Sequence, residues 1–139
     1  MTAYDPNNIF AKILRGEMPA TKVFEDDVAL AFMDIMPRAD GHTLVIPKTP
    51  ARNMFDIAPE ALSGLIQRVQ LVARAAVKGM GAEGASIQQF NESAGGQIVF
   101  HIHFHVLPRW TGVHLRPPGV MGDKAAIAAH AEKIRVAFG

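Results

Sequence analysis

The sequence contains no cysteine, which excludes disulfide bonds and metal sites built on thiolates. It also has no long run of one charge, since 14 Lys and Arg residues stand against 13 Asp and Glu residues. A basic nucleic-acid surface or a polybasic membrane anchor needs clustered Lys and Arg, so neither is expected. No stretch approaches the roughly 18 consecutive apolar residues of a membrane-spanning helix. The N-terminal MTAYDPNNIF lacks the pattern of a signal peptide, so we expect a soluble cytoplasmic protein.

What the sequence does contain is enough apolar material for a core, with 49% hydrophobic residues in 139 positions. We therefore expect a single domain over residues 1–139. The period of the apolar residues predicts short helices at both ends, five strands and one long amphipathic helix. The expected helices span 5–16, 59–78 and 123–138, and the expected strands lie near 21–24, 28–34, 42–48, 85–92 and 98–107. This order predicts an α+β fold, an antiparallel five-stranded sheet with one long helix packed across it.

The last predicted strand carries an unusual pattern, HIHFHVL, in which three of the six histidines occupy every second position. Side chains alternate between the two faces of a strand, so His101, His103 and His105 share one face. The other face is apolar and is expected to point into the core; it comprises Ile98, Phe100, Ile102, Phe104 and Val106. Because that apolar face sets the register, the three imidazoles are expected to point away from the core together.

Three interpretations of this histidine face compete. A polar strand that happens to use histidine is disfavoured by strict alternation of three imidazoles in a chain with six. A metal site is possible for two neighbours about 6.7 Å apart, but the outer pair, roughly 13 Å apart, would share one ion only awkwardly. Phosphate chemistry is the third, because neutral imidazole is both a nucleophile and a proton carrier near neutral pH.

The residues also resemble a known family. HIHFHVL matches the histidine-triad (HIT) signature at every position, and NESAGGQ resembles the loop that precedes the triad in that family. The segment from NIFAKILRGE to TLVIPK resembles the N-terminal half of the nucleoside phosphoramidase and dinucleoside polyphosphate hydrolase branches. The resemblance covers residues 8–110 and implies a HIT-like fold, with 111–139 as a C-terminal extension.

The resemblance implies a role for each histidine of the motif. His103, in the middle, corresponds to the family nucleophile that attacks the α-phosphorus of a nucleotide and becomes a transient nucleotidyl-histidine. His101 and His105 correspond to neighbours that orient it and contact phosphate oxygens. His42, in DGHTLVIP, matches a fourth histidine that helps to order the triad. An imidazole nucleophile needs one nitrogen free and the other held by an acceptor.

The resemblance also implies a nucleotide-binding set. Asp34 matches the acidic residue that holds the ribose hydroxyls, although a turn after an apolar strand would also use aspartate. The remaining positions match apolar residues around the base (Phe10, Ile13 and Ile35) and polar residues near the phosphates (Asn91 and Gln97). Core packing is an alternative for the apolar three, and a structural turn is an alternative for Asn91.

Two departures from the family pattern bear on specificity. The N-terminal cysteine pair that holds a structural zinc in some members is absent, so that zinc site is not expected here. The reaction that the resemblance implies needs no tightly bound metal or other cofactor. Magnesium is expected only with a polyphosphate substrate. The serine that follows the loop glutamine in phosphoramidases is replaced by Ile98, whereas Pro108–Arg109 resembles the polyphosphate-cleaving members and many bacterial relatives.

These observations predict a nucleotide hydrolase or transferase that acts at the α-phosphate of purine nucleotide conjugates, either dinucleoside polyphosphates or nucleoside phosphoramidates. By resemblance, a homodimer is expected, with the helix at 59–78 in the interface. One alternative is a nucleotide-binding regulatory or scaffold protein with little turnover, which would need Asp34 but not His103. The other alternative is a strand-based metal-binding protein.

Overall fold

The structure is a computed structural model that describes residues 3–138; positions 1, 2 and 139 of the domain expected over 1–139 lie outside the described residues. The elements follow in the order α1 (Ile9–Leu14), β1 (Lys22–Glu25), β2 (Ala29–Met33), β3 (Thr43–Pro47), α2 (Pro59–Met80), β4 (Gly84–Gln88), the 3-10 turn η1 (Ser93–Gly95), β5 (Phe104–Arg109) and α3 (Lys124–Ala137). The predicted α+β class, with a five-stranded antiparallel sheet and one long helix, is confirmed.

The sheet has the strand order β1-β2-β3-β5-β4, and every neighbouring pair is antiparallel. Strand β3 lies at the centre and joins β5, which carries the last histidine of the motif. In this pairing Leu44 lies opposite His105. The register therefore brings the segment just before β3, which contains His42, next to the histidine strand.

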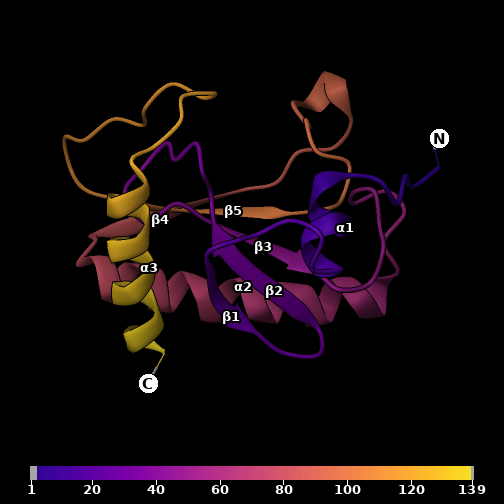
Figure 1. Ribbon diagram of the computed structural model, residues 1–139, viewed down its shortest axis with the longest axis horizontal. Helices are drawn as coiled ribbons and strands as arrows, with labels where there is room; N and C mark the ends of the chain where they lie inside the picture. Colours follow the sequence, from indigo (N-terminus) through magenta and orange to yellow (C-terminus); the bar gives the residue numbers. More distant parts are fainter. Residues whose placement is uncertain (1–2, 139) are drawn as a thin grey trace.

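Helix α2 covers one face of the sheet, as its amphipathic spacing predicts (Figure 1). Its buried side chains, among them Leu65, Val69 and Val72, pack in one core with Val45 and Val106 from the sheet. Helix α3, yellow in Figure 1, stands at one end of the sheet and adds buried side chains to the same core; these are Ile127, Ala131 and Ile134. No helix within residues 3–138 is long and apolar enough to cross a membrane.

Helix α1 covers part of the opposite face. Phe10 and Ile13 pack there in a second apolar cluster, with side chains of β2 and β3. The helix is capped by Asn8, whose side chain accepts a hydrogen bond from the Ala11 N–H. The helix expected over 5–16 therefore begins later than predicted, at Ile9, and Asp5 accepts from the Asn7 N–H instead of capping it. The difference arises because the chain turns once more before the helix begins.

The end of α2 also differs from the prediction, which ended this helix at residue 78, whereas α2 continues to Met80. Gly81 does end it, in a left-handed conformation with a φ of 61°. Gly79 lies inside the helix, where a Cβ atom would come within 2.5 Å of the Lys133 carbonyl oxygen of α3. Glycine is thus needed there for close contact between two helices, which the sequence pattern does not reveal.

Strand β5 is shorter than predicted, because it begins at Phe104 rather than near residue 98. Before it, the chain pairs with a loop, and the Ile102 N–H donates to the Ala51 carbonyl oxygen at 2.9 Å. The predicted core-facing set is right for Ile102, Phe104 and Val106, which are buried. It is wrong for Ile98, which is 84% exposed because the chain is still turning there.

Candidate active site

The four predicted histidines gather on the face of the sheet opposite α2. The ring centroids of His103 and His105 lie 5.1 Å apart, and those of His42 and His105 lie 5.2 Å apart. The imidazoles point away from the α2 core as expected, yet His42, His101 and His103 are buried. Helix α1 covers them in part, since the Phe10 ring meets the His103 ring edge-on at 4.9 Å.

The middle histidine has a fixed tautomer. Its Nδ1 lies 2.7 Å from the carbonyl oxygen of His101, and a carbonyl oxygen can only accept, so Nδ1 carries the ring proton. The lone pair then belongs to Nε2. Burial lowers the pKa of His103, which keeps the ring neutral. Nε2 of His103 therefore offers the free lone pair that a nucleophile needs.

His42 and His105 form a short hydrogen-bond chain. The Arg38 N–H donates to Nδ1 of His42, so the proton of His42 is on Nε2. That Nε2 lies 3.0 Å from Nδ1 of His105 and donates to it. Burial lowers the pKa of His42 to about 4, with a contribution from the Arg38 guanidinium, and burial lowers the pKa of His105 to about 3. Both rings are neutral at pH 7, and His105 keeps an N–H at Nε2.

The first histidine of the motif is held on both sides by the protein. Nε2 of His101 donates to the Pro47 carbonyl oxygen at 2.9 Å, and Nδ1 lies 2.7 Å from the Tyr4 hydroxyl. The ring is 0% exposed. Both nitrogens are therefore occupied by protein groups, which favours an orienting role for His101 over a phosphate contact. Tyr4 was not foreseen from the sequence, since it lies 97 positions away.

Asp34 stands at the edge of this cluster and is 19% exposed. One carboxylate oxygen accepts from the Met36 N–H at 2.8 Å, which is the turn interaction considered above. The other lies 3.5 Å from Nε2 of His42. The carboxylate thus supports the turn and faces the histidines at the same time, so the turn role leaves one oxygen for a ligand.

Asp34, His42 and His105 could in principle hold a metal ion, because one ligand atom from each lies within 4.8 Å of the others. The hydrogen bonds argue against this. Nδ1 of His42 accepts from the Arg38 N–H, so the Nε2 atom that faces the other two groups carries a proton and offers no lone pair. The donor set therefore fits a metal ion poorly.

The three apolar residues that were predicted to surround the base differ in their burial and in their distance from the histidines. Phe10 contacts the His103 ring, as described above, and Ile13 is buried beneath α1 in the apolar cluster. Ile35 is 55% exposed, directly after Asp34. The structure therefore brings Phe10 to the histidines and leaves Ile35 accessible beside the carboxylate, whereas Ile13 serves the core.

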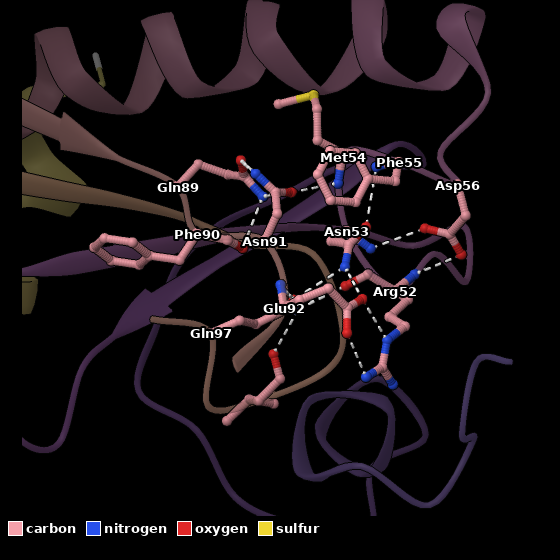
Figure 2. Close-up of polar contacts among 11 residues, drawn as sticks. Arg52, Asn53, Met54, Phe55, Asp56, Gln89, Phe90, Asn91, Glu92 and Gln97 are labelled. Carbon is pink, nitrogen blue, oxygen red and sulfur yellow. Dashed lines mark hydrogen bonds and ion pairs between the residues drawn. The ribbon is translucent and has the colours of Figure 1, made fainter. Parts of the chain in front are cut away.

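The loop before the triad is held by a polar network (Figure 2). Gln97 is 3% exposed, and its Nε2 donates to the carbonyl oxygens of Arg52 and Val99. Its Oε1 accepts from the Asn53 amide and from the Glu92 N–H. A glutamine amide offers two donors and two acceptor sites, so Gln97 is satisfied by the protein alone.

Asn91 belongs to the same network. Its Oδ1 accepts from the Met54 N–H at 2.8 Å and from the Gln89 amide, to which its own Nδ2 donates in return. Asn91 thus ties the chain after β4 to the loop that precedes α2. The contact of Asn91 and Gln97 with phosphates stays a prediction, while their contacts with the loop are visible in Figure 2.

Glu92 adopts a strained backbone conformation within this loop. Its φ of 64° and ψ of 164° lie in a region that is essentially reserved for glycine. Arg52 holds the Glu92 carboxylate with two hydrogen bonds, of 2.8 and 2.9 Å, and the Asn53 amide adds a third. These bonds, led by that of Arg52, lower the pKa of Glu92 to about 2. We call this pair the Arg52–Glu92 clamp.

The clamp also reaches the triad. The Arg52 guanidinium lies 4.1 Å from the centroid of the Phe100 ring, one residue before His101. The loop at 92–97 and the start of the histidine segment are therefore fixed by one side chain. Sequence reasoning missed this pair, because two opposite charges 40 positions apart carry no local signal.

Comparison with known proteins places this site in context. The model of the HIT domain family matches residues 15–112. Adenylylsulfatase HINT3 from Arabidopsis thaliana is 35% identical over 124 residues; the match covers 85% of this chain but only 63% of that protein. Adenosine 5'-monophosphoramidase hnt1 from Schizosaccharomyces pombe is 38% identical over 101 residues, which is 73% of each chain.

Solved structures share the same fold. A Hit-like protein from Bartonella henselae is 48% identical and superposes with a TM-score of 0.93, over 98% of this chain and 99% of that one. A Zn-bound histidine triad family protein from Mycobacterium smegmatis is 36% identical, with a TM-score of 0.82 over 95% and 93% of the two chains. The likeness to the first extends through the C-terminal residues.

Proposed function

This chain belongs to the HIT domain family, and from that premise we propose that it is a nucleotide hydrolase or transferase acting at the α-phosphate of purine nucleotide conjugates. The names of two relatives, an adenylylsulfatase and an adenosine monophosphoramidase, support this reaction class. The observation that carries the proposal is the hydrogen bond between Nδ1 of His103 and the His101 carbonyl oxygen, at 2.7 Å. It leaves a nucleophilic lone pair on Nε2.

The reaction is proposed to have two steps. Nε2 of His103 attacks the α-phosphorus, so a P–N bond forms while the bond to the leaving group breaks and its electron pair departs with that group. The ring gains positive charge, and the proton stays on Nδ1, where it remains hydrogen-bonded to the His101 carbonyl oxygen. Water, or another acceptor in a transfer reaction, then attacks the same phosphorus, loses a proton to solvent and releases His103.

The other residues are assigned around this step. The Nε2–H of His105 is proposed to donate to a phosphate oxygen, while His42 holds the opposite side of that ring. The free oxygen of Asp34 is proposed to accept from the ribose hydroxyls, which suits a short carboxylate. Phe10 and Ile35 are proposed to line the base. The contact of Phe10 with the His103 ring and the position of Ile35 directly after Asp34 support these two assignments.

The leaving group and the assembly belong to the proposal as well. Dinucleoside polyphosphates and nucleoside phosphoramidates are the proposed substrates, with magnesium arriving only on a polyphosphate. A homodimer is proposed because β4 lies at an edge of the sheet, and because large apolar side chains are exposed on β4 and α2; these are Ile87, Ile66 and Leu71.

The test of the proposal is His103→Ala, assayed against adenosine phosphoramidate and diadenosine polyphosphate. Turnover should be lost, while nucleotide affinity stays within a few-fold, because a nucleophile contributes mainly to the transition state. His114→Ala is the matched control, since His114 is exposed and lies outside the cluster. A His103→Ala protein that retains most of its kcat would contradict the covalent mechanism. A wild-type protein that binds nucleotide without turnover would favour the binding protein instead.

A further inference from the structure

One side chain from the N-terminal segment contacts the triad. The hydroxyl of Tyr4 lies 2.7 Å from Nδ1 of His101, and the two rings meet edge to face with centroids 5.7 Å apart. The contact joins residues 97 positions apart, so it is a tertiary contact and not a feature of a local turn. Tyr4 is half-buried, and neither the HIT motif nor the proposed nucleotide pocket includes it.

The direction of this hydrogen bond follows from the other side of the ring. Nε2 of His101 faces the Pro47 carbonyl oxygen at 2.9 Å, and a carbonyl can only accept. The ring proton is therefore on Nε2, so Nδ1 is an acceptor and the Tyr4 hydroxyl is the donor. The ring is 0% exposed and is held between two fixed partners.

The same residue supports the nucleophile through its backbone. The His101 carbonyl oxygen accepts the Nδ1 proton of His103, which fixes the tautomer that the proposed reaction needs. A His101 ring anchored at both nitrogens limits movement of its own main chain, and hence of that carbonyl. His101 therefore links Tyr4 to His103: its ring accepts a hydrogen bond from Tyr4, and its carbonyl oxygen accepts one from His103. Small displacements of a nucleophile can cost a large factor in rate.

We propose that Tyr4 is a positioning residue for the His103 nucleophile, acting through His101 and not through contact with the substrate. The inference rests on the proposed nucleotidyl transfer and adds a residue to it. Because the effect passes through the nucleophile, it belongs to the chemical step and leaves substrate binding unchanged. Removal of the hydroxyl should therefore lower kcat and leave KM as it is.

The first experiment is Tyr4→Phe, which removes the donor and keeps the ring. We expect kcat to fall roughly fivefold to tenfold, the scale of one neutral hydrogen bond, with KM within twofold of the wild type. Asp5→Ala is the matched control, because Asp5 is the next residue along the chain and is exposed. Its carboxylate accepts a hydrogen bond from the Asn7 N–H and does not contact the histidines, so this variant should leave kcat unchanged. Unchanged kcat in Tyr4→Phe, or a raised KM with kcat intact, would overturn the inference.

The chain offers a second measurement, because Tyr4 is its single tyrosine. Biosynthetic replacement with a tetrafluorotyrosine therefore alters this position alone and makes its phenol more acidic. We expect kcat of this protein to fall as the pH rises through ionisation of the fluorinated phenol, since the donor is then lost, while the wild type shows no such fall. Parallel pH profiles would refute the role of Tyr4 even if Tyr4→Phe folded poorly.

A ¹⁵N spectrum of the histidine rings separates the contact from its consequence. In Tyr4→Phe the Nδ1 resonance of His101 should move, because its lone pair loses a hydrogen bond, while His130 in α3 should not change. If the Nδ1 chemical shift of His101 is the same in Tyr4→Phe and in the wild type, the contact is absent in solution. Wild-type protein without turnover on any nucleotide conjugate would refute the proposed function itself, whereas equal turnover of wild type and Tyr4→Phe refutes only this inference.

Discussion

At the scale of single residues, the site is defined by where each imidazole carries its proton. His103 donates to a backbone carbonyl, and His42 accepts from a backbone N–H. His101 lies between a carbonyl and a phenol, and His105 accepts from His42. Each ring therefore has one donor and one acceptor nitrogen, which is the neutral form. Burial and these hydrogen-bond partners therefore favour the neutral form of each imidazole over the imidazolium cation.

The neutral rings predict a pH dependence of stability. The pKa of His42 is lowered to about 4 and that of His105 to about 3. In the unfolded chain these histidines have their ordinary pKa of about 6.5, so below that pH the unfolded chain binds protons that the folded chain does not. The contribution of the two rings to stability is therefore fully present above about pH 6.5 and is lost as the pH falls. A histidine of this kind contributes about 2 kcal/mol to that loss between pH 7 and pH 5.

For the two rings together, we expect the free energy of unfolding to fall by on the order of 4 kcal/mol between pH 7 and pH 5. Urea unfolding at the two pH values measures it. The His42→Gln protein is the control and should show a shallower loss, because one of the rings that the folded state keeps neutral is gone. A wild-type free energy of unfolding that stays level over this range would mean that the rings are not held neutral.

The residue scale also shows what the sequence could and could not predict. The alternation of His101, His103 and His105 predicted their common face. The motif also pointed to His103 as the nucleophile, and this role stays a prediction. The occupied nitrogens of His101 could not be predicted, because they depend on Pro47 and on Tyr4, which no local pattern connects to the motif.

At the scale of elements, the loop at 89–97 is the part that sequence reasoning described least well. The strands around it are shorter than predicted, and in place of a longer ladder the amide side chains of Asn91 and Gln97 bond to the backbone of the loop at 52–54. Helices α2 and α3 were predicted nearly to their ends, since their apolar period is long and each has a readable end signal, Gly81 or Asp123. Periodicity is a strong signal, whereas side-chain bonds between distant loops leave none.

The Arg52–Glu92 clamp gives a prediction at this scale. Arg52→Ala should destabilise the protein and lower activity, because Glu92 then keeps its strained φ of 64° without the two hydrogen bonds from Arg52. Adding Glu92→Gly to Arg52→Ala should restore part of the lost stability, since glycine adopts this φ freely. Urea unfolding at pH 7 compares the two. If the added glycine destabilises the Arg52→Ala protein further, the strain is not what the clamp maintains.

At the scale of the whole molecule, the C-terminal extension is joined to the site. The Arg116 N–H donates to the Arg38 carbonyl oxygen at 2.7 Å, and the Gly122 N–H donates to the Ile35 carbonyl oxygen at 2.9 Å. The extension therefore runs along the turn that follows Asp34 before α3 packs on α2. The Bartonella henselae structure shares this full extent, which the motif alone could not indicate.

The proposed homodimer gives a prediction for the whole molecule. Light scattering at micromolar concentration should give twice the chain mass of 15.0 kDa. Ile87→Lys places a charge on the exposed edge strand β4 and should shift the mass toward a single chain, without loss of helix content. A wild-type mass of one chain at all concentrations would contradict the dimer.

The central claim is that His103 becomes covalently nucleotidylated, and intact-mass spectrometry tests it most directly. The protein is mixed with adenosine phosphoramidate or a diadenosine polyphosphate and quenched under denaturing conditions that are not acidic, because phosphorus–nitrogen bonds to histidine are acid-labile. The account predicts one added adenylyl group, mapped to His103 after digestion and absent in His103→Ala. Turnover with no adduct at any time point, or an adduct on another residue, would contradict it.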